Sequence, residues 1–297
     1  MVSSKNIPEE SKHKKTRALT YQQLITTYNI DSKGVLLSKE TNEPLPKEDK
    51  ELEVLSDALL QYLQKHYLIS QLKMKEVWIP ENSDNQCNIF LSDDFYTNNT
   101  AVVVLIQGSG FVRAGQWSCG LCLNIGVEHG SMMSYLTRAK ESGYAYIILN
   151  PNYNENVETL IPIQGHEDAT KHVSYVWDVF INKLNVRNLF VVAHSFGGHC
   201  ICKLMSQSNV GSLNKISSVA LLESVHGYGR KFDFNSEVQD TIQNHSASWK
   251  ASDMPLDTYL GIDNSGIKVL SGGSRGHSEV ALDAVDSVFN LFKNALK

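Results

Sequence analysis

Hydrophobic and polar positions along this chain alternate in blocks that predict strands and helices in turn. The run from Ala101 to Gly108 is continuously apolar, as expected of a strand that is covered on both faces. Further strand-like runs are predicted at 144–150, 188–194, 216–224 and 267–273. Helical stretches are predicted between and after them, near 132–142, 167–184, 195–208, Val238 and 278–296. This order predicts an α/β fold, with a mostly parallel twisted sheet and helices on both faces.

The pattern divides the chain into three parts. Residues 1–17 are polar and are predicted to be a disordered tail, and residues 18–70 are predicted to form a helical and hairpin extension that packs on the core. The main domain is then 71–297, and it opens with an antiparallel pair of strands around a turn-rich segment. Between 224 and 267 the pattern predicts the helical stretch and a loop, but no strand.

Composition narrows the function classes. The 297 residues carry a net charge of −5 and are 42% hydrophobic, which is enough for a sizeable core in one large domain, although two domains stay open. The acidic balance and the lack of a long basic stripe argue against a direct DNA partner and disfavour RNA binding. A small basic patch at Lys12–Arg17 is the one local exception. No apolar run reaches the length of a membrane span, so no membrane partner is expected.

The cysteines do not indicate a metal site. Five cysteines in a chain without an export signal are expected to be reduced thiols. Cys119 and Cys122 have the C-x-x-C spacing, but a zinc site would need a second such pair. We therefore predict no metal, and the absence of a nucleotide or cofactor motif predicts no cofactor.

The segment FVVAHSFGGH, residues 190–199, places a serine between a predicted strand and a predicted helix. Ala193-His194-Ser195-Phe196-Gly197 is similar to the G-x-S-x-G turn that carries the nucleophile of α/β hydrolases. Small flanking residues let strand and helix approach closely, and the helix N-terminus offers amides to an oxyanion. The motif predicts an α/β-hydrolase-like domain at 71–297, with Ser195 as the candidate nucleophile.

A serine nucleophile needs a base, and hydrolases of this fold place the triad in the order serine, acid, histidine. His277 follows the last predicted strand and is the candidate base. Two acids compete for the third place. Glu223 ends the strand after the serine turn, and Asp257 lies in the following loop. We favour Glu223, because the carboxyl end of its strand faces the same crevice as Ser195, and we keep Asp257 as the alternative.

The loop Gln107–Phe111 follows the strand that precedes the first helix of the main domain. A glycine-rich loop at this place commonly supplies an oxyanion N–H, so Ser109, Gly110 and the amide of Phe196 are the candidate donors. The alternative is a tight glycine turn that binds nothing. Arg113, just beyond the loop, is a candidate for binding a carboxylate or phosphate, and the alternative is a salt bridge that holds the loop.

Six segments stand out along the chain: LIQGSGFVRAGQW (105–117), YIILNPN (146–152), YVWDVFI (175–181), VVAHSFGGH (191–199), VALLESVH (219–226) and PLDT (255–258). Together they resemble the argonaute-binding-protein family, whose members carry an α/β-hydrolase-like domain. The family includes a fission-yeast argonaute-complex subunit and animal cotranscriptional regulators, and a related domain is appended to some fungal histone deacetylases. The similarity runs through nearly the whole chain from about Tyr21.

The resemblance implies a role in small-RNA-mediated gene silencing and heterochromatin assembly. It implies a subunit that binds argonaute and a further argonaute-binding subunit, in nucleus and cytoplasm, with the hydrolase-like fold as an interaction scaffold. This interpretation leans against an enzyme, and the triad would then be vestigial. The alternative is an active serine hydrolase for an ester, thioester or amide bond, in which Ser195 attacks, His277 takes the proton and Glu223 orients the ring.

Overall fold

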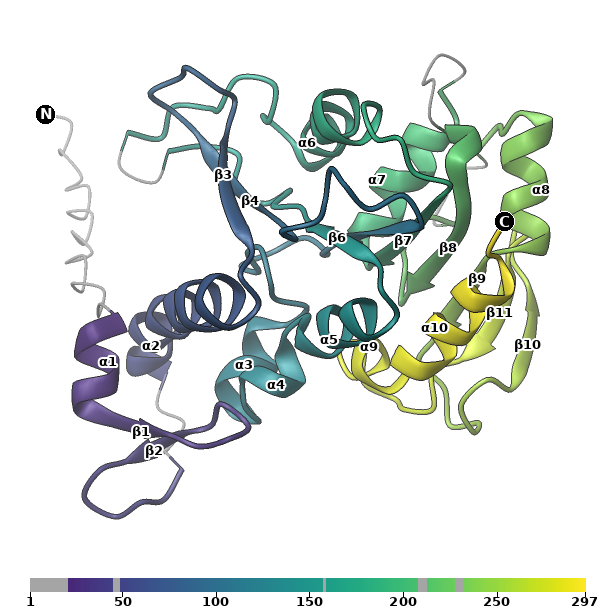
Figure 1. Cartoon of the computed structure of the whole chain (residues 1–297). Coiled ribbons are helices and arrows are strands. Elements are labelled where there is room, and N and C mark those ends of the chain that lie inside the picture. The colour runs from purple at the N-terminus through teal and green to yellow at the C-terminus, as the bar shows by residue number, and fades with distance from the viewer. Residues whose placement is uncertain (1–20, 45–48, 157–158, 208–212, 228–231) are drawn as a thin grey trace, which may run out of the picture.

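The computed structural model describes residues 21–44, 49–156, 159–207, 213–227 and 232–297 (Figure 1). Its main body is a nine-stranded sheet in the spatial order β10-β11-β9-β8-β7-β5-β6-β4-β3. The strands are β3 (Lys75–Ile79), β4 (Cys87–Leu91), β5 (Ala101–Ile106), β6 (Ala145–Ile148), β7 (Asn188–His194), β8 (Ile216–Leu222), β9 (Ala247–Lys250), β10 (Tyr259–Ile262) and β11 (Lys268–Ser271).

Most of this sheet is parallel. The six neighbouring strands from β6 to β11 all run in the same direction. At the edges, β4 pairs antiparallel with β6, β3 with β4, and β10 with β11. Parallel neighbours need crossover connections, and the amphipathic segments between the strands supply helices for them. The arrangement confirms the predicted α/β-hydrolase-like fold class.

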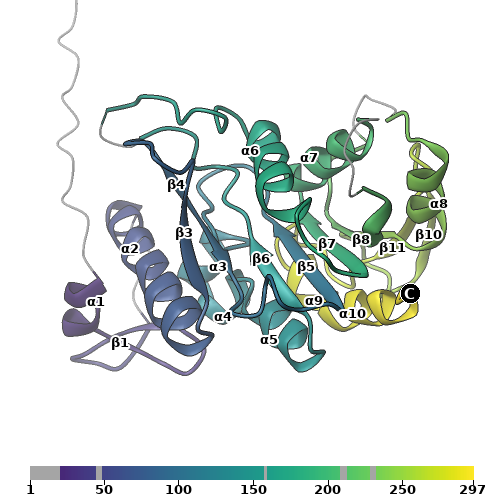
Figure 2. The ribbon, with the colours of Figure 1, turned by 45° about the horizontal axis from the view of Figure 1, so that its top comes forward.

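Helices cover both faces of the sheet (Figure 2). On one face lie α6 (Ala169–Val176), α7 (Phe196–Met205) and α8 (Ser236–Asn244). On the other lie α5 (Met133–Glu141), α9 (Val280–Asp283) and α10 (Val285–Asn294). Strand β5 shows why its apolar run is continuous, since Val102, Val104 and Ile106 pack into the first layer and Ala101, Val103 and Leu105 into the second. A strand buried on both faces has no polar side to alternate with.

The N-terminal elements pack beside this body. They are α1 (Tyr21–Thr27), the hairpin of β1 (Tyr28–Ile30) and β2 (Leu36–Ser38), α2 (Asp49–Gln61) and the π-helix η1 (Tyr62–Gln71). Leu55, Leu59 and Leu63 share a buried cluster with Val127, in the short helix α4 (Val127–Gly130). The predicted tail, 1–17, lies outside the described residues. The boundary at residue 70 stays a prediction.

Three expectations from the pattern need correction. No strand was predicted between 224 and 267, but β9 and β10 both lie there, with β9 between β8 and β11 in the sheet and β10 at its edge. The helix expected over 167–184 is shorter and ends in a π-helical turn at Trp177–Ile181, and the last helix is divided between α9 and α10. None of the helices in the described part of the chain has the length and apolar character needed to cross a membrane.

Candidate functional site

Ser195 occupies a sharp turn between β7 and α7. Its backbone has φ 51° and ψ −119°, a conformation that a non-glycine residue adopts only under strain. The turn is tied to the next strand, because the Ser195 amide donates to the Leu222 carbonyl at 2.9 Å. Gly197 allows the close crossing, since a Cβ there would lie 2.7 Å from the carbonyl oxygens of Ile106 and Gln107. The structure therefore places the candidate nucleophile on a hydrolase-type elbow.

His277 and Glu223 meet at the same edge of the sheet. His277 Nδ1 lies 3.0 Å from Glu223 Oε2, although the residues are 54 positions apart. The carboxylate is fixed from its other side, where Glu223 Oε1 accepts the Ala251 amide at 2.5 Å. Binding Nδ1 to an acid leaves Nε2 for proton transfer with a nucleophile. Among the hydrogen bonds of the described residues none joins Ser195 to His277, and triads without ligand are commonly loose in this way.

Asp257, the alternative acid, is engaged elsewhere. Trp249 Nε1 donates to Asp257 Oδ1 at 2.8 Å, and Ser287 Oγ donates to Asp257 Oδ2 at 2.6 Å. These bonds tie β9 to α10, so the carboxylate holds two elements together. Of the two candidate acids, the structure brings Glu223 to His277.

The loop after β5 passes directly over the elbow. A Cβ on Gly108 would lie 2.7 Å from the Cβ of Ser195, so Gly108 is the point of closest approach. Asn152 Nδ2 holds the loop by donating to the Gly108 carbonyl at 2.6 Å and the Val112 carbonyl at 3.1 Å. Ser109 and Gly110 are exposed beside this contact. The amide of Phe196 belongs to the first turn of α7, where N–H groups have no intrahelical acceptor. Their oxyanion role stays a prediction.

Arg113 braces this loop. Its Nη1 donates to the Val112 carbonyl at 3.2 Å, and its guanidinium lies over the Tyr153 ring, 5.9 Å from the centroid. Burial lowers the pKa of Arg113. Nη1 also donates to the Gly110 carbonyl at 3.5 Å. The contacts shown are to two backbone oxygens and a ring, so they account for a loop-holding role, while binding of an anion stays a prediction.

His194, the variable residue of the A-x-S-x-G motif, was not singled out from the sequence. It is buried, and its ring centroid lies 4.8 Å from that of His277. Its Nε2 donates to the His277 carbonyl at 3.2 Å, which ties β7 to the loop that carries the candidate base. Burial lowers the pKa of His194 to about 4, so the ring is neutral near pH 7.

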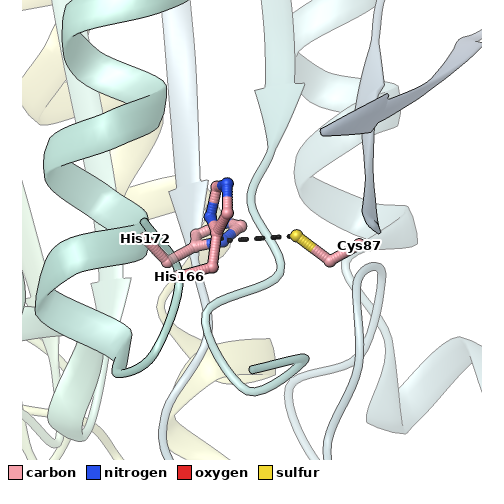
Figure 3. A group of neighbouring side chains, drawn as sticks. All are labelled: Cys87, His166 and His172. Atoms are coloured by element: carbon pink, nitrogen blue, oxygen red, sulfur yellow. Dashed lines mark hydrogen bonds between the residues drawn. The ribbon is translucent and has the colours of Figure 1, made fainter. Parts of the chain in front are cut away.

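A second polar group, Cys87, His166 and His172, is buried away from any motif (Figure 3). These are the ligand types that suit zinc, and their ligand atoms lie within 4.8 Å of one another. His166 Nδ1 lies 2.9 Å from His172 Nδ1, and Cys87 Sγ lies 3.7 Å from the same nitrogen. Residue types alone therefore do not separate a metal site from a hydrogen-bonded group.

The direction of the hydrogen bonds distinguishes a metal site from a hydrogen-bonded group. The Asn150 amide donates to His172 Nε2 at 3.0 Å, so a neutral His172 carries its proton on Nδ1 and donates it to His166 Nδ1. A metal-bound histidine normally donates from its second nitrogen, and here that nitrogen accepts. The arrangement favours a relay that fixes Asn150. Asn150 Oδ1 in turn accepts from Gln107 Nε2 at 3.3 Å and from the Ala114 amide at 3.1 Å, at either end of the loop over the elbow.

Comparisons with known proteins agree with this architecture. The model of the Arb2 domain matches residues 39–161 and 153–256. A "Cotranscriptional regulator ARB2A homolog" of Dictyostelium discoideum is 30% identical, over 91% of this chain and 79% of its own. The human "Cotranscriptional regulator ARB2A" is 28% identical, over 90% and 79%. A solved structure, "A histone deacetylase from Saccharomyces cerevisiae", has a TM-score of 0.53 at 12% identity, covering 82% of this chain and 98% of that one. That last likeness concerns the fold alone.

Proposed function

The chain belongs to the Arb2 domain family, and from this premise we propose that it is a subunit of an argonaute-containing complex. It would act in small-RNA-mediated gene silencing and heterochromatin assembly, in nucleus and cytoplasm. The hydrolase-like body would serve as a scaffold that binds argonaute and a further argonaute-binding subunit. The observation that carries the proposal is the 30% identity with a cotranscriptional regulator over 91% of the chain.

The charge of the chain supports a scaffold for proteins. The net charge of −5 favours protein contacts over direct contacts with DNA or RNA.

Affinity purification of the tagged chain from its own cells tests the proposal. Argonaute should be enriched with the wild type. It should be enriched equally with Ser195→Ala, because a scaffold does not use the hydroxyl. Purifications that recover the tagged chain without argonaute contradict the proposal.

A second candidate function, an active serine hydrolase, is favoured by the bond between His277 Nδ1 and Glu223 Oε2 and by the strained elbow. In this function Ser195 Oγ attacks the carbonyl carbon of an ester, thioester or amide, and His277 Nε2 accepts its proton. Glu223 stabilises the imidazolium, and amides of the Gly108 loop and Phe196 hold the oxyanion. His277 then gives this proton to the leaving alcohol, thiol or amine, which departs and leaves the acyl group on Ser195. Water attacks the acyl carbon as His277 takes a proton from it, and His277 returns that proton to Ser195 Oγ as the carboxylic acid leaves.

Labelling by a fluorophosphonate probe separates the two functions. An active hydrolase is labelled in the wild type, is not labelled as Ser195→Ala, and is labelled at least about a hundredfold more slowly as His277→Gln. The exposed Ser70→Ala is the matched control and should be labelled like the wild type. Equal labelling of wild type and Ser195→Ala rules out the hydrolase function.

A further inference from the structure

A second serine–histidine–acid group is formed by Ser224, His226 and Asp263, and nothing in the site described above uses it. Ser224 Oγ lies 2.7 Å from His226 Nδ1, and His226 Nε2 lies 2.7 Å from Asp263 Oδ2. Ser224 is 1% exposed and His226 is 2% exposed. We call these three residues the buried relay.

The relay has a defined direction. Asp263 Oδ1 accepts the amides of Ser265 at 2.8 Å and Ile267 at 3.1 Å, and Oδ2 faces His226. A carboxylate offers only acceptors, so His226 donates from Nε2, and a neutral ring then accepts the Ser224 hydroxyl proton at Nδ1. The order of bonds is that of a catalytic triad.

Ser224 cannot serve as a nucleophile for an outside substrate. Its hydroxyl is packed under the first turn of α7, where a Cβ on Gly198 would lie 1.9 Å from Ser224 Oγ. With no exposed path to the oxygen, a substrate carbonyl does not reach it. The relay must therefore act on its own neighbourhood.

That neighbourhood is the segment Glu223–His226, which crosses the candidate active site. The Glu223 amide donates to the Trp249 carbonyl at 2.8 Å, and the Val225 amide donates to the Ser195 carbonyl at 3.2 Å. Lys250 Nζ donates to the Ser224 carbonyl. Glu223 has φ 46°, a left-handed backbone that a non-glycine residue keeps only when its surroundings hold it.

We propose that Ser224, His226 and Asp263 are positioning residues that hold this segment so that Glu223 Oε2 keeps its bond to His277 Nδ1. The proposal rests on the hydrolase function for its meaning in catalysis. The bond that it concerns can be measured whether or not Ser195 reacts. An acid bound to Nδ1 keeps the proton there, so the fraction of neutral His277 in the Nδ1–H form reports on the position of Glu223.

The test is nuclear magnetic resonance of the full chain with ¹⁵N-labelled histidine, where ring nitrogens with and without a proton are distinguished. His277 is assigned from the signal lost in His277→Gln. In Asp263→Asn the oxygen that faces His226 becomes a donor, so a neutral His226 must accept at Nε2 and carry its proton on Nδ1. This reverses the bond to Ser224 Oγ and removes the ring acceptor of the Ser224 hydroxyl proton. We expect the ratio of Nδ1–H to Nε2–H forms at His277 to fall at least threefold, towards the value of Glu223→Ala. Asp240→Asn, which removes the same charge on the exposed side of α8, should keep the wild-type ratio.

The proposal is overturned if Asp263→Asn keeps the wild-type ratio of Nδ1–H to Nε2–H forms at His277 while Glu223→Ala lowers it. His226→Gln is measured in the same way, so that the test holds if Asp263→Asn does not fold. A ratio that responds to Asp263 in a chain without fluorophosphonate labelling supports the positioning role and rejects the hydrolase function. A ratio that does not respond even to Glu223→Ala overturns the positioning role.

Discussion

At the scale of single residues, the site contains backbone conformations that residues other than glycine normally avoid. Ser195 and Glu223 both have positive φ, at 51° and 46°. Each such residue costs on the order of 1–3 kcal/mol and persists only where the surroundings hold it. The bonds of Ser195 and Val225 to neighbouring backbone, and the buried relay beside Glu223, are the contacts that can offset this cost.

Gly198 is the glycine on which this packing depends most. Replacing it with alanine would place a methyl group within 1.9 Å of the buried Ser224 Oγ. We expect Gly198→Ala to lower the free energy of unfolding by about 1–3 kcal/mol through overpacking. Gly120→Ala, in the exposed part of α3 (Cys119–Asn124) with Ser118 Oγ 3.9 Å away, should be neutral or slightly stabilising. Unfolding of both variants in denaturant measures these changes. A Gly198→Ala variant as stable as the wild type would contradict the tight packing of residue 198 against Ser224 Oγ.

At the scale of elements, the sequence pattern predicts those helices and strands whose formation depends mainly on residues close together in the chain. The buried strands and most helices followed from periodicity, and the elbow followed from a motif between a strand and a helix. Strand β9 did not, because its sequence, ASWK, has no alternation long enough to recognise. It is a strand because it pairs with β8 and β11, which are distant in the chain. The bond between His226 and Asp263 spans 37 residues and has no local signal, so the relay also could not be predicted.

Helix α10 is expected to contribute strongly to the stability of the fold through its packing on one face of the sheet. Its Phe292 is fully buried and stacks on Phe190 of β7, with ring centroids 4.5 Å apart and an interplanar angle of 4°. We expect Phe292→Ala to cost about 3–5 kcal/mol in the free energy of unfolding. Lys293→Ala, one position along the same helix and exposed, should change it by less than about 0.5 kcal/mol. Unfolding curves in denaturant measure the free energy of unfolding of both variants. Similar losses in Phe292→Ala and Lys293→Ala would exclude this packing role for Phe292.

At the scale of the whole molecule, the candidate site is a consequence of topology. Ser195, Glu223 and His277 follow β7, β8 and β11, and Gly108 follows β5. Because these strands are parallel, their carboxyl ends lie at one edge of the sheet, and residues far apart in the chain meet there. The order of motifs was therefore enough to predict which elements converge. The same order favoured Glu223 but left Asp257 open, because the choice depends on where each side chain finds its hydrogen bonds.

The stability of the whole molecule should fall in mild acid, because histidines are buried in neutral form. Burial lowers the pKa of His166 and of His194 to about 4, and that of His172 well below its ordinary value. An unfolded histidine takes up a proton near pH 6.5. Between about pH 6.5 and 4 the unfolded chain therefore binds more protons than the folded chain, and stability decreases as the pH falls. Above this window neither state binds these protons, and they leave stability unchanged.

His194 allows this effect to be isolated. Between pH 7.5 and 4.5 its share of the loss should be about 2–3 kcal/mol. In His194→Gln the free energy of unfolding should therefore fall by that much less over the same interval than in the wild type. Phe190→Leu, a buried variant without a titrating group, should be less stable at every pH and should lose the same amount as the wild type. Denaturant unfolding at half-unit steps of pH gives these curves, and a His194→Gln curve parallel to the wild type would show that this buried ring does not make folding sensitive to acid.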